Sequence, residues 1–251
     1  MALVSTATTS GGNGAAPPPA VREVLDRRQR QKLSAGDDRE FYSVPRLVHH
    51  LDAGFRAQLT QLYRQRIPEG GDVLDLCSSW VSHLPPERKY GRVVGHGMNA
   101  AELGRNAQLS EFFVRDLNRQ PSGWAFADES FDAVLCCASC QYLEQPEAVF
   151  AEMRRVLKPG GVAIVAFSNR MFYEKAIAAW RDNTDYGRCV LVKSYFAAAG
   201  GFSEPEVVKR VELPAQATGL VQQVQMWGER LFSGGSSDPF FAVVAHKLGT
   251  E

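Results

Sequence analysis

Long apolar runs are missing from this chain of 251 residues. No window approaches the roughly 20 uninterrupted apolar residues that a membrane-spanning helix needs. The longest apolar runs, such as 240–245, have the length of a strand. We therefore expect a protein without a membrane span.

A surplus of charge is also missing, since 28 Lys and Arg residues balance 28 Asp and Glu residues. Proteins that bind nucleic acid usually carry excess basic charge to hold the phosphates. The basic run Arg27–Lys32 is short, and we interpret it as a solvated flank. We expect a small-molecule substrate and no nucleic-acid partner, and the oligomeric state stays open.

Cysteines are few: five in the chain, with three at Cys136, Cys137 and Cys140. This is not the dense, even-numbered framework of a disulfide-stapled secreted domain, so a reducing compartment is expected. Residues 137–140 read formally as C-x-x-C, a redox or metal pattern. They fall in or just after an expected central strand, and no second cysteine pair or histidine cluster completes a zinc site. We expect small buried side chains there and no metal.

Residues 1–20 contain no charged side chain and are rich in Gly, Pro, Ala, Ser and Thr. Such a composition buries too little apolar surface to offset the entropy of ordering. It predicts a disordered tail or a targeting segment, since an acid-free stretch rich in Ser and Thr is also typical of organellar transit peptides. The expected location is the cytoplasm or an organellar matrix, in a plastid stroma or a mitochondrion.

Short apolar runs alternate with helical patterns after residue 45. Apolar residues recur at helical spacing over 45–67 and again from Pro146 to Leu157. The strand-like runs are 72–76, 92–95, 112–114, 133–138, 162–167, 207–213 and 240–247. This alternation predicts an α/β fold, a Rossmann-like doubly wound sheet with helices on both faces. We expect seven strands, mostly parallel, with an antiparallel C-terminal strand.

Two motifs carry a family resemblance. The strand beginning Phe131-Asp132 is followed, after the second helix, by Arg155-Val156-Leu157-Lys158-Pro159-Gly160-Gly161. Over roughly residues 70–170 the chain resembles the class I S-adenosylmethionine-dependent methyltransferases, in particular their type 11-like small-molecule group. The resemblance implies one domain over 21–251, with an N-terminal helical lid (37–69), a cofactor-binding core (70–170) and a C-terminal half (171–251) carrying a substrate cap at 214–239.

The resemblance also implies where S-adenosylmethionine binds. Asp75 matches the acid of the family's first motif, but the usually glycine-rich loop after it reads Cys77-Ser78-Ser79-Trp80. Gly97 stands where the family places an acid for the ribose hydroxyls, which leaves Asn99, His96 or Asp75 for that role. Asp116 matches the residue that contacts the adenine amino group, with Leu117 against the ring. The expected cofactor-binding residues are Asp75, Cys77, Ser78, Ser79, Gly95, His96, Gly97, Met98, Asn99, Asp116, Leu117, Asn118, Cys137 and Ala138.

Methyl transfer asks the protein mainly to align the reactants and to exclude water, and a base matters only for a protonated acceptor. The candidate catalytic residues are Tyr142 and His83. We expect a methyltransferase acting on a small organic acceptor. The alternative is a non-catalytic relative that binds a nucleoside-type ligand or a protein partner. A dinucleotide-dependent oxidoreductase is disfavoured, because the loop after the first strand lacks G-x-G-x-x-G.

Overall fold

The computed structural model describes residues 22–214 and 237–249. The expected N-terminal tail and nearly all of the expected cap at 214–239 lie outside the described residues. None of the helices in the described part of the chain is long and apolar enough to cross a membrane.

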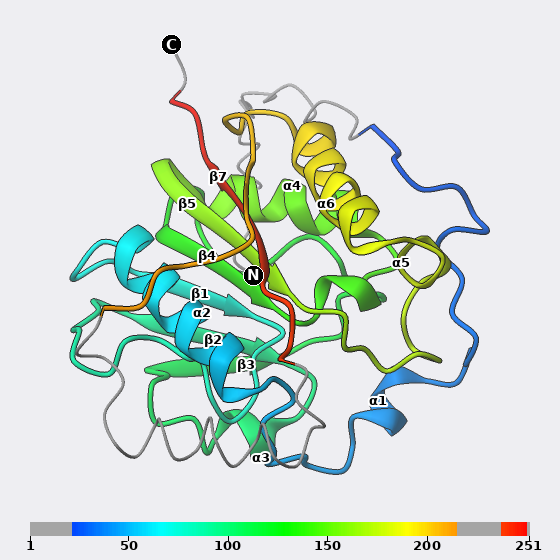
Figure 1. Cartoon of the computed structure of the whole chain (residues 1–251), viewed down its shortest axis with the longest axis horizontal. Helices are drawn as coiled ribbons and strands as arrows, with labels where there is room; N and C mark the ends of the chain where they lie inside the picture. The colour runs from blue at the N-terminus through cyan, green and yellow to red at the C-terminus, as the bar shows by residue number, and fades with distance from the viewer. Residues whose placement is uncertain (1–21, 215–236, 250–251) are drawn as a thin grey trace, which may run out of the picture.

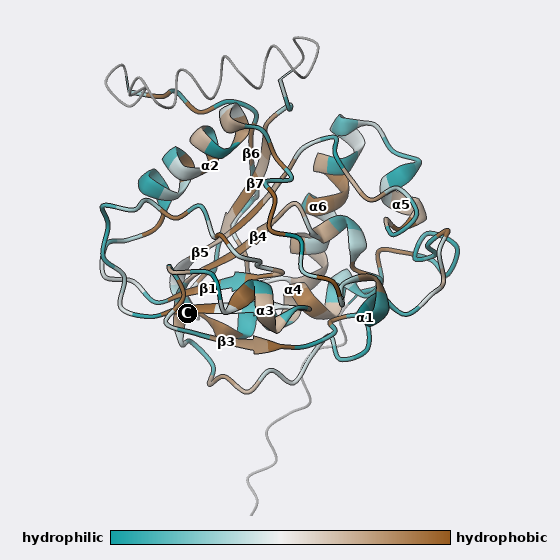
Figure 2. Ribbon diagram, turned by 90° about the horizontal axis from the view of Figure 1, so that it is seen from below, coloured by the Kyte–Doolittle hydropathy of each residue, from teal (hydrophilic) through white to brown (hydrophobic). Residues whose placement is uncertain are grey.

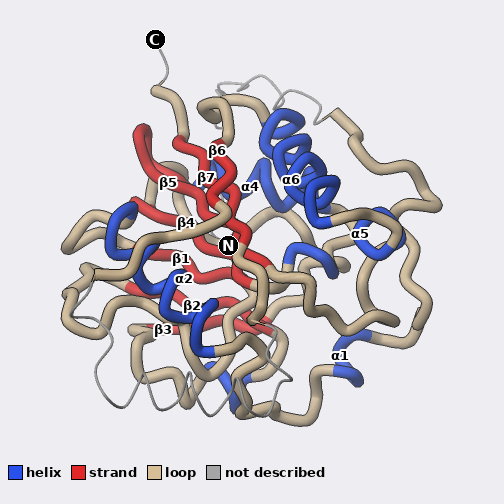
Figure 3. The backbone as a smooth tube through the Cα atoms, in the orientation of Figure 1, coloured by secondary structure: helices blue, strands red, loops and turns tan. Residues whose placement is uncertain are grey.

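One sheet of seven strands forms the centre of the described structure (Figure 3). Its order is β3-β2-β1-β4-β5-β7-β6. The strands are β1 (Val73–Leu76), β2 (Val93–Gly97), β3 (Glu111–Val114), β4 (Phe131–Cys137), β5 (Leu157–Phe167), β6 (Glu206–Val208) and β7 (Phe241–His246). Strands β1 to β5 are parallel, and β7 pairs antiparallel with both β5 and β6. The predicted doubly wound, mostly parallel sheet is confirmed.

Helices cover both faces of this sheet (Figure 1). They are α1 (Asp38–Phe41), α2 (Ala53–Arg66), α3 (Ala100–Leu103), α4 (Pro146–Val156), α5 (Ala178–Arg181) and α6 (Asp185–Ala199), with a 3₁₀ helix η1 at Cys140–Tyr142. Successive residues of a strand point to opposite faces. Accordingly Val73 packs in one core cluster with α2, whereas Leu74 packs in a second cluster with α4 and α6. Much of the sheet is brown in Figure 2, the colour of hydrophobic residues.

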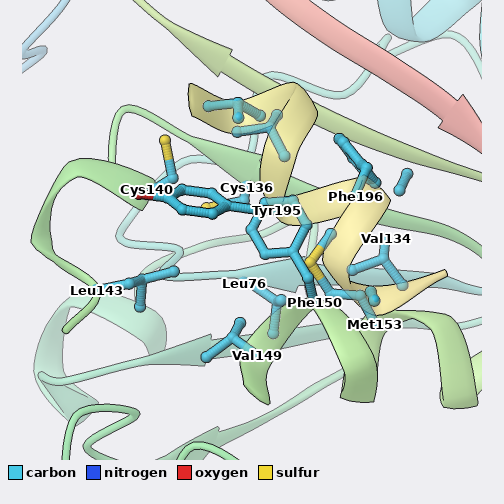
Figure 4. Packing of buried hydrophobic residues seen from close by; sticks show 14 of the residues in the cluster. Leu76, Val134, Cys136, Cys140, Leu143, Val149, Phe150, Met153, Tyr195 and Phe196 are labelled. Carbon is cyan, nitrogen blue, oxygen red and sulfur yellow. The ribbon is translucent and has the colours of Figure 1, made fainter. Parts of the chain in front are cut away.

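Cys136 and Cys140 belong to this second core, whereas Cys137 packs against the first. Cys136 and Cys140 are 3% and 1% exposed, and all five cysteines are free. Figure 4 shows both thiols among the apolar side chains around Phe150 and Tyr195, whose rings meet edge to face at 5.4 Å. These two cysteines therefore act as small buried side chains, as expected from the sequence.

Three element boundaries differ from the sequence prediction by five residues or more. The helix expected over 45–67 begins only at Ala53, because Asp52 caps it by accepting a hydrogen bond from the Phe55 N–H at 2.7 Å. Strand β5 begins at Leu157, which pairs with Phe131, so the Lys-Pro-Gly-Gly turn lies within the strand. Strand β6 ends at Val208 instead of continuing to residue 213.

An N-terminal strap, residues 22–37, crosses from the outer helices to α1 (Figure 1). The buried carboxylate of Glu147 in α4 accepts hydrogen bonds from the main chain of Val24 at 2.8 Å and of Leu25 at 3.0 Å. It also pairs with the Arg30 guanidinium at 2.8 Å. Farther along, the Asp38 carboxylate pairs with the buried ammonium of Lys175 at 3.0 Å. These contacts bring α1 and the segment after it to one edge of the sheet.

Candidate functional site

A cavity of about 710 Å³ lies at the carboxyl ends of β1, β2 and β4. The chain winds from β1 toward β3 on one side and from β4 outward on the other, which makes this the switch point where doubly wound folds bind ligands. The opposite wall comes from residues 42–51 and 169–173. The volume falls within the roughly 300–1,000 Å³ of sites that bury a small ligand.

Nearly all of the residues singled out from the sequence line this cavity. Those lining it are Asp75, Cys77, Ser78, Ser79, His83, His96, Gly97, Met98, Asn99, Asp116, Leu117, Asn118, Cys137, Ala138 and Tyr142. The exception is Gly95. A side chain there would meet Leu109, so this glycine gives Leu109 room to pack on β2 and does not face the cavity.

His96 anchors the loop that follows β1. Its Nδ1 accepts a hydrogen bond from the Cys77 N–H at 3.0 Å, so Nε2 carries the proton and donates to the Arg115 carbonyl at 2.8 Å. The Ser78 N–H adds a hydrogen bond of 2.6 Å to the His96 carbonyl. Both ring nitrogens are thus used inside the protein, which removes His96 from the candidates for the ribose.

The missing acid at Gly97 has a steric reason. A Cβ at this position would lie 2.6 Å from the Ser78 carbonyl oxygen. The loop after β1 therefore occupies the space that an acidic side chain at the end of β2 would need. The loop reaches this path through Cys77, which has a φ of 53°, in the left-handed region that favours glycine.

Asn99 serves as the N-cap of α3. Its Oδ1 accepts from the N–H groups of Ala101 and Glu102, and its Nδ2 donates to the carbonyls of Tyr42 and Ser43. The amide already has four hydrogen bonds, so Asn99 holds the segment after α1 in place and offers little to a ligand.

Glu102 is the carboxylate that α3 brings to this wall. One oxygen accepts from the Arg46 main-chain N–H at 2.6 Å, and the other accepts from the Ser79 hydroxyl at 2.5 Å. Each oxygen retains a further lone pair. The residue was missed in the sequence, although Asn-x-x-Glu is a helix-start pattern that points to it.

The segment after β3 is built around an Asx turn. Asp116 lines the cavity and accepts a hydrogen bond from the Asn118 N–H at 2.9 Å through Oδ1, while its Oδ2 lies 3.9 Å from Nε of Arg119. Leu117 is buried beside it. Asn118 joins three segments, because its amide donates to Asp38 and to the Tyr142 carbonyl and accepts from the Glu144 N–H. Asn118 is therefore a structural link in the cavity wall.

Asp75 is a buried carboxyl group at the base of the cavity, 4% exposed. Burial raises its pKa to about 6, because a desolvated carboxylate loses the stabilisation of water. A nearby positive charge on a ligand would favour its ionised form.

Burial shifts the pKa values of the two catalytic candidates, Tyr142 and His83, in opposite directions. Burial raises the pKa of Tyr142 to about 12, and its hydroxyl oxygen accepts from the Phe172 N–H at 2.9 Å. Tyr142 is thus protonated at neutral pH and positions residue 172. Burial lowers the pKa of His83 to about 4, so its imidazole is neutral at neutral pH and a weaker base than a free histidine.

Several lining residues were not among the expected cofactor-binding or catalytic residues, although four of them fall in the expected lid at 37–69. They are Asp38, Tyr42, Arg46, His50, Glu102, Gln141 and Phe172. Gln141 donates from Nε2 to the Ala138 carbonyl, while its buried Oε1 has no hydrogen-bond partner among the described residues. Apart from the helix-start pattern at Glu102, no local pattern marks these residues, since their position in the wall depends on contacts between distant segments.

Comparison with known proteins gives a match to the methyltransferase domain family over residues 82–165. A malonyl-[acyl-carrier protein] O-methyltransferase of Hahella chejuensis is 30% identical over 134 residues, which cover 49% of this chain and 46% of that protein. The matched segment thus spans about half the length of this curated relative.

Solved structures share the fold. A methyltransferase of Haloferax volcanii, in complex with the Trm112 methyltransferase activator, superposes with a TM-score of 0.54 at 16% identity and covers 79% of this chain and 91% of its own. A phosphoethanolamine N-methyltransferase of Haemonchus contortus, in complex with S-adenosyl-L-methionine, gives a TM-score of 0.51 at 14% identity, covering 80% of this chain and 54% of its own. At such identities the likeness is one of architecture.

Proposed function

We propose that this chain, whose residues 82–165 match the methyltransferase domain family, is a class I S-adenosylmethionine-dependent methyltransferase that transfers a methyl group to a small organic acceptor. The observation that carries the proposal is the cavity at the switch point of the sheet, with acidic groups at or near the ends of β1, β2 and β3. In a sheet of this kind such groups face a bound nucleotide-like ligand.

The described residues fit this cofactor. S-adenosylmethionine carries an ammonium group, a sulfonium and two ribose hydroxyls, all of which pair with carboxylates and amide oxygens. Asp75, Glu102 and Asp116 line the cavity, and the buried Oε1 of Gln141 is an acceptor without a donor in the described structure. Leu117 and Ala138 supply apolar surface for the adenine ring.

We assign the roles within this wall as follows. Asp116 accepts from the adenine amino group with the oxygen that the Asx turn leaves free. The ribose hydroxyls bind the Glu102 carboxylate, which replaces the acid that the Ser78 carbonyl excludes from position 97. The methionine part lies toward Asp75 and the loop of Cys77, Ser78 and Ser79. Met98, Asn118 and Cys137 complete the cofactor wall.

When bound, the cofactor supplies an already activated methyl group. The protein's own contribution is alignment and exclusion of water, for which Phe172 and Tyr142 line the wall opposite the strand ends. Where the acceptor carries a proton, we assign its removal to the neutral imidazole of His83. Tyr142, with its raised pKa, is assigned to positioning through its hydrogen bond to Phe172.

Calorimetric titration with S-adenosylmethionine and S-adenosylhomocysteine tests the proposal. We expect saturable binding of both, and a loss of about tenfold or more in Asp116→Ala, because a hydrogen bond involving a charged group contributes roughly 1.5–3 kcal/mol. Asp128→Ala is the matched control, since that carboxylate is 74% exposed and pairs with Arg155 outside the cavity. Absence of heat at millimolar ligand would contradict the proposal and favour the non-catalytic alternative.

A further inference from the structure

The guanidinium of Arg46 lies in the cavity wall without an anionic partner among residues 22–214 and 237–249. Its Nη2 donates to the Phe41 carbonyl at 2.8 Å. Its Nη1 is buried and makes no hydrogen bond to any described residue. The group lies over the Phe41 ring at 4.4 Å and near the Phe172 ring at 5.6 Å. The aromatic rings hold it in place but do not neutralise its charge.

Two other charged groups of the same wall are paired inside the protein, while Arg115, which also lines the cavity, donates to the carbonyls of Ser122 and Gly123. Arg170 pairs with Asp238 at 2.5 Å, and Asp38 pairs with Lys175 at 3.0 Å. The nearby Glu102 carboxylate accepts from the main-chain N–H of Arg46, but no described carboxylate lies within 4.0 Å of the guanidinium. Removing a cation from water without a counterion is unfavourable. An unpaired guanidinium in a cavity wall is therefore poised to receive an anion from a ligand.

The surroundings of Arg46 favour a carboxylate. His50 also lines this part of the cavity, and burial, together with the charges of Arg46 and Arg170, lowers its pKa, so the imidazole is neutral and carries one N–H. Nη1 of Arg46 and the imidazole N–H of His50 are two hydrogen-bond donors. Two donors suit a ligand group with a single negative charge. The planar guanidinium matches the geometry of a carboxylate, and the ring of Phe172 offers an apolar surface beside it.

We propose that Arg46 is the carboxylate-binding residue of this cavity. The inference rests on the proposed function for the identity of its ligands. Two ligands present the same chemistry there: the acceptor, and the amino-acid part of the cofactor. The guanidinium binds either carboxylate through Nη1, and the experiment separates the two sources.

Four probes make the test. S-adenosylhomocysteine carries the amino-acid carboxylate, and 5′-methylthioadenosine lacks it. Benzoate carries a carboxylate, and benzamide is its neutral counterpart of similar shape. Each is titrated by calorimetry into the wild-type protein and Arg46→Gln, and benzoate and benzamide are titrated with and without saturating S-adenosylhomocysteine. Arg39→Gln is the matched control, because Arg39 is 59% exposed, pairs with Asp37 and lies outside the cavity.

If the acceptor supplies the carboxylate, Arg46→Gln weakens benzoate by about 10- to 100-fold and leaves benzamide and S-adenosylhomocysteine unchanged. If the cofactor supplies it, the variant weakens S-adenosylhomocysteine by that factor and leaves 5′-methylthioadenosine unchanged. The wild-type protein alone can overturn the proposal. It does so if benzoate binds no more tightly than benzamide and S-adenosylhomocysteine binds no more tightly than 5′-methylthioadenosine. A variant that binds all four probes like wild type would also overturn it.

Failure of the proposed function gives a different result. In that case neither S-adenosylhomocysteine nor 5′-methylthioadenosine binds, while the comparison of benzoate with benzamide on the free protein still decides whether Arg46 binds a carboxylate. Circular dichroism of Arg46→Gln checks that the variant is folded. If the variant is unfolded, the comparison of charged with neutral probes on the wild-type protein still tests the proposal.

Discussion

The backbone N–H of Cys77 donates a hydrogen bond to Nδ1 of His96, 19 residues later, across 3.0 Å. Through the opposite ring nitrogen the same histidine reaches the Arg115 carbonyl at 2.8 Å. One buried side chain thus connects the carboxyl ends of β1, β2 and β3. The loop that forms the floor of the cavity is held by the protein itself, before any ligand binds.

Replacing this connection should destabilise the fold. His96→Phe keeps a ring but leaves the Cys77 N–H and the Arg115 carbonyl without partners, and each unsatisfied group costs roughly 1–3 kcal/mol. We expect the free energy of unfolding to fall by at least about 2 kcal/mol in denaturant titrations. His246→Phe, at a partly exposed histidine of β7, should change it much less. Equal effects of the two substitutions would contradict the role of His96.

Restoring the family's acid at position 97 should not improve cofactor binding. The Ser78 carbonyl oxygen lies 2.6 Å from the position of any Cβ there, so Gly97→Ala and Gly97→Asp both force the loop to move. We expect each to lower stability by about 1–3 kcal/mol, the usual scale of overpacking. Gly249→Ala, where a Cβ meets nothing within 4 Å, serves as the control in thermal melts. Tighter binding of S-adenosylhomocysteine by Gly97→Asp would show that the assignment to Glu102 is wrong.

At Cys77 we expect a glycine variant to be more stable than an alanine variant, the reverse of the usual order. Its φ of 53° favours glycine, so Cys77→Gly should be more stable than Cys77→Ala by roughly 1 kcal/mol. Both variants remove the thiol, so the comparison isolates the backbone term. At Cys140, which lacks a positive φ, the alanine variant should be the more stable of the pair. Chemical denaturation of the four proteins measures both differences.

Asp75 should make stability depend on pH. Its pKa is about 6 in the folded protein and about 3.9 in an unfolded chain, so the folded state binds more protons between these values and stability falls as pH rises through about 4–6. At about 1.4 kcal/mol per pKa unit, the loss approaches 3 kcal/mol above pH 6. Asp75→Asn should remove it, so the variant exceeds the wild type by this amount at pH 7 and matches it below pH 4. A difference that stays constant with pH would contradict the shift.

Local sequence patterns were sufficient for most of the architecture. The run at 73–76 and the Pro146 helix start were recognisable because strand burial and helix capping are expressed within a few residues. The start of α2 was wrong by eight residues, because Ser43 and Asp52 are both good caps and only packing chooses between them. The strap held by Glu147 was not foreseen, since its hydrogen bonds join residues more than 100 positions apart.

The candidate site also contains residues that could be located from the sequence and residues whose roles only the tertiary structure shows. Asp75, Gly97 and Asp116 were located from their places at the ends of expected strands, because parallel strands bring their carboxyl ends to one edge. The sequence by itself determined the doubly wound class of the sheet, that edge and the family resemblance. Only the tertiary structure decided that His96 and Asn99 are used within the protein, that the Ser78 carbonyl excludes an acid at 97, and that the Arg46 guanidinium lacks a partner. Whether a polar group is free or satisfied depends on atoms from distant segments, and local sequence does not contain that information.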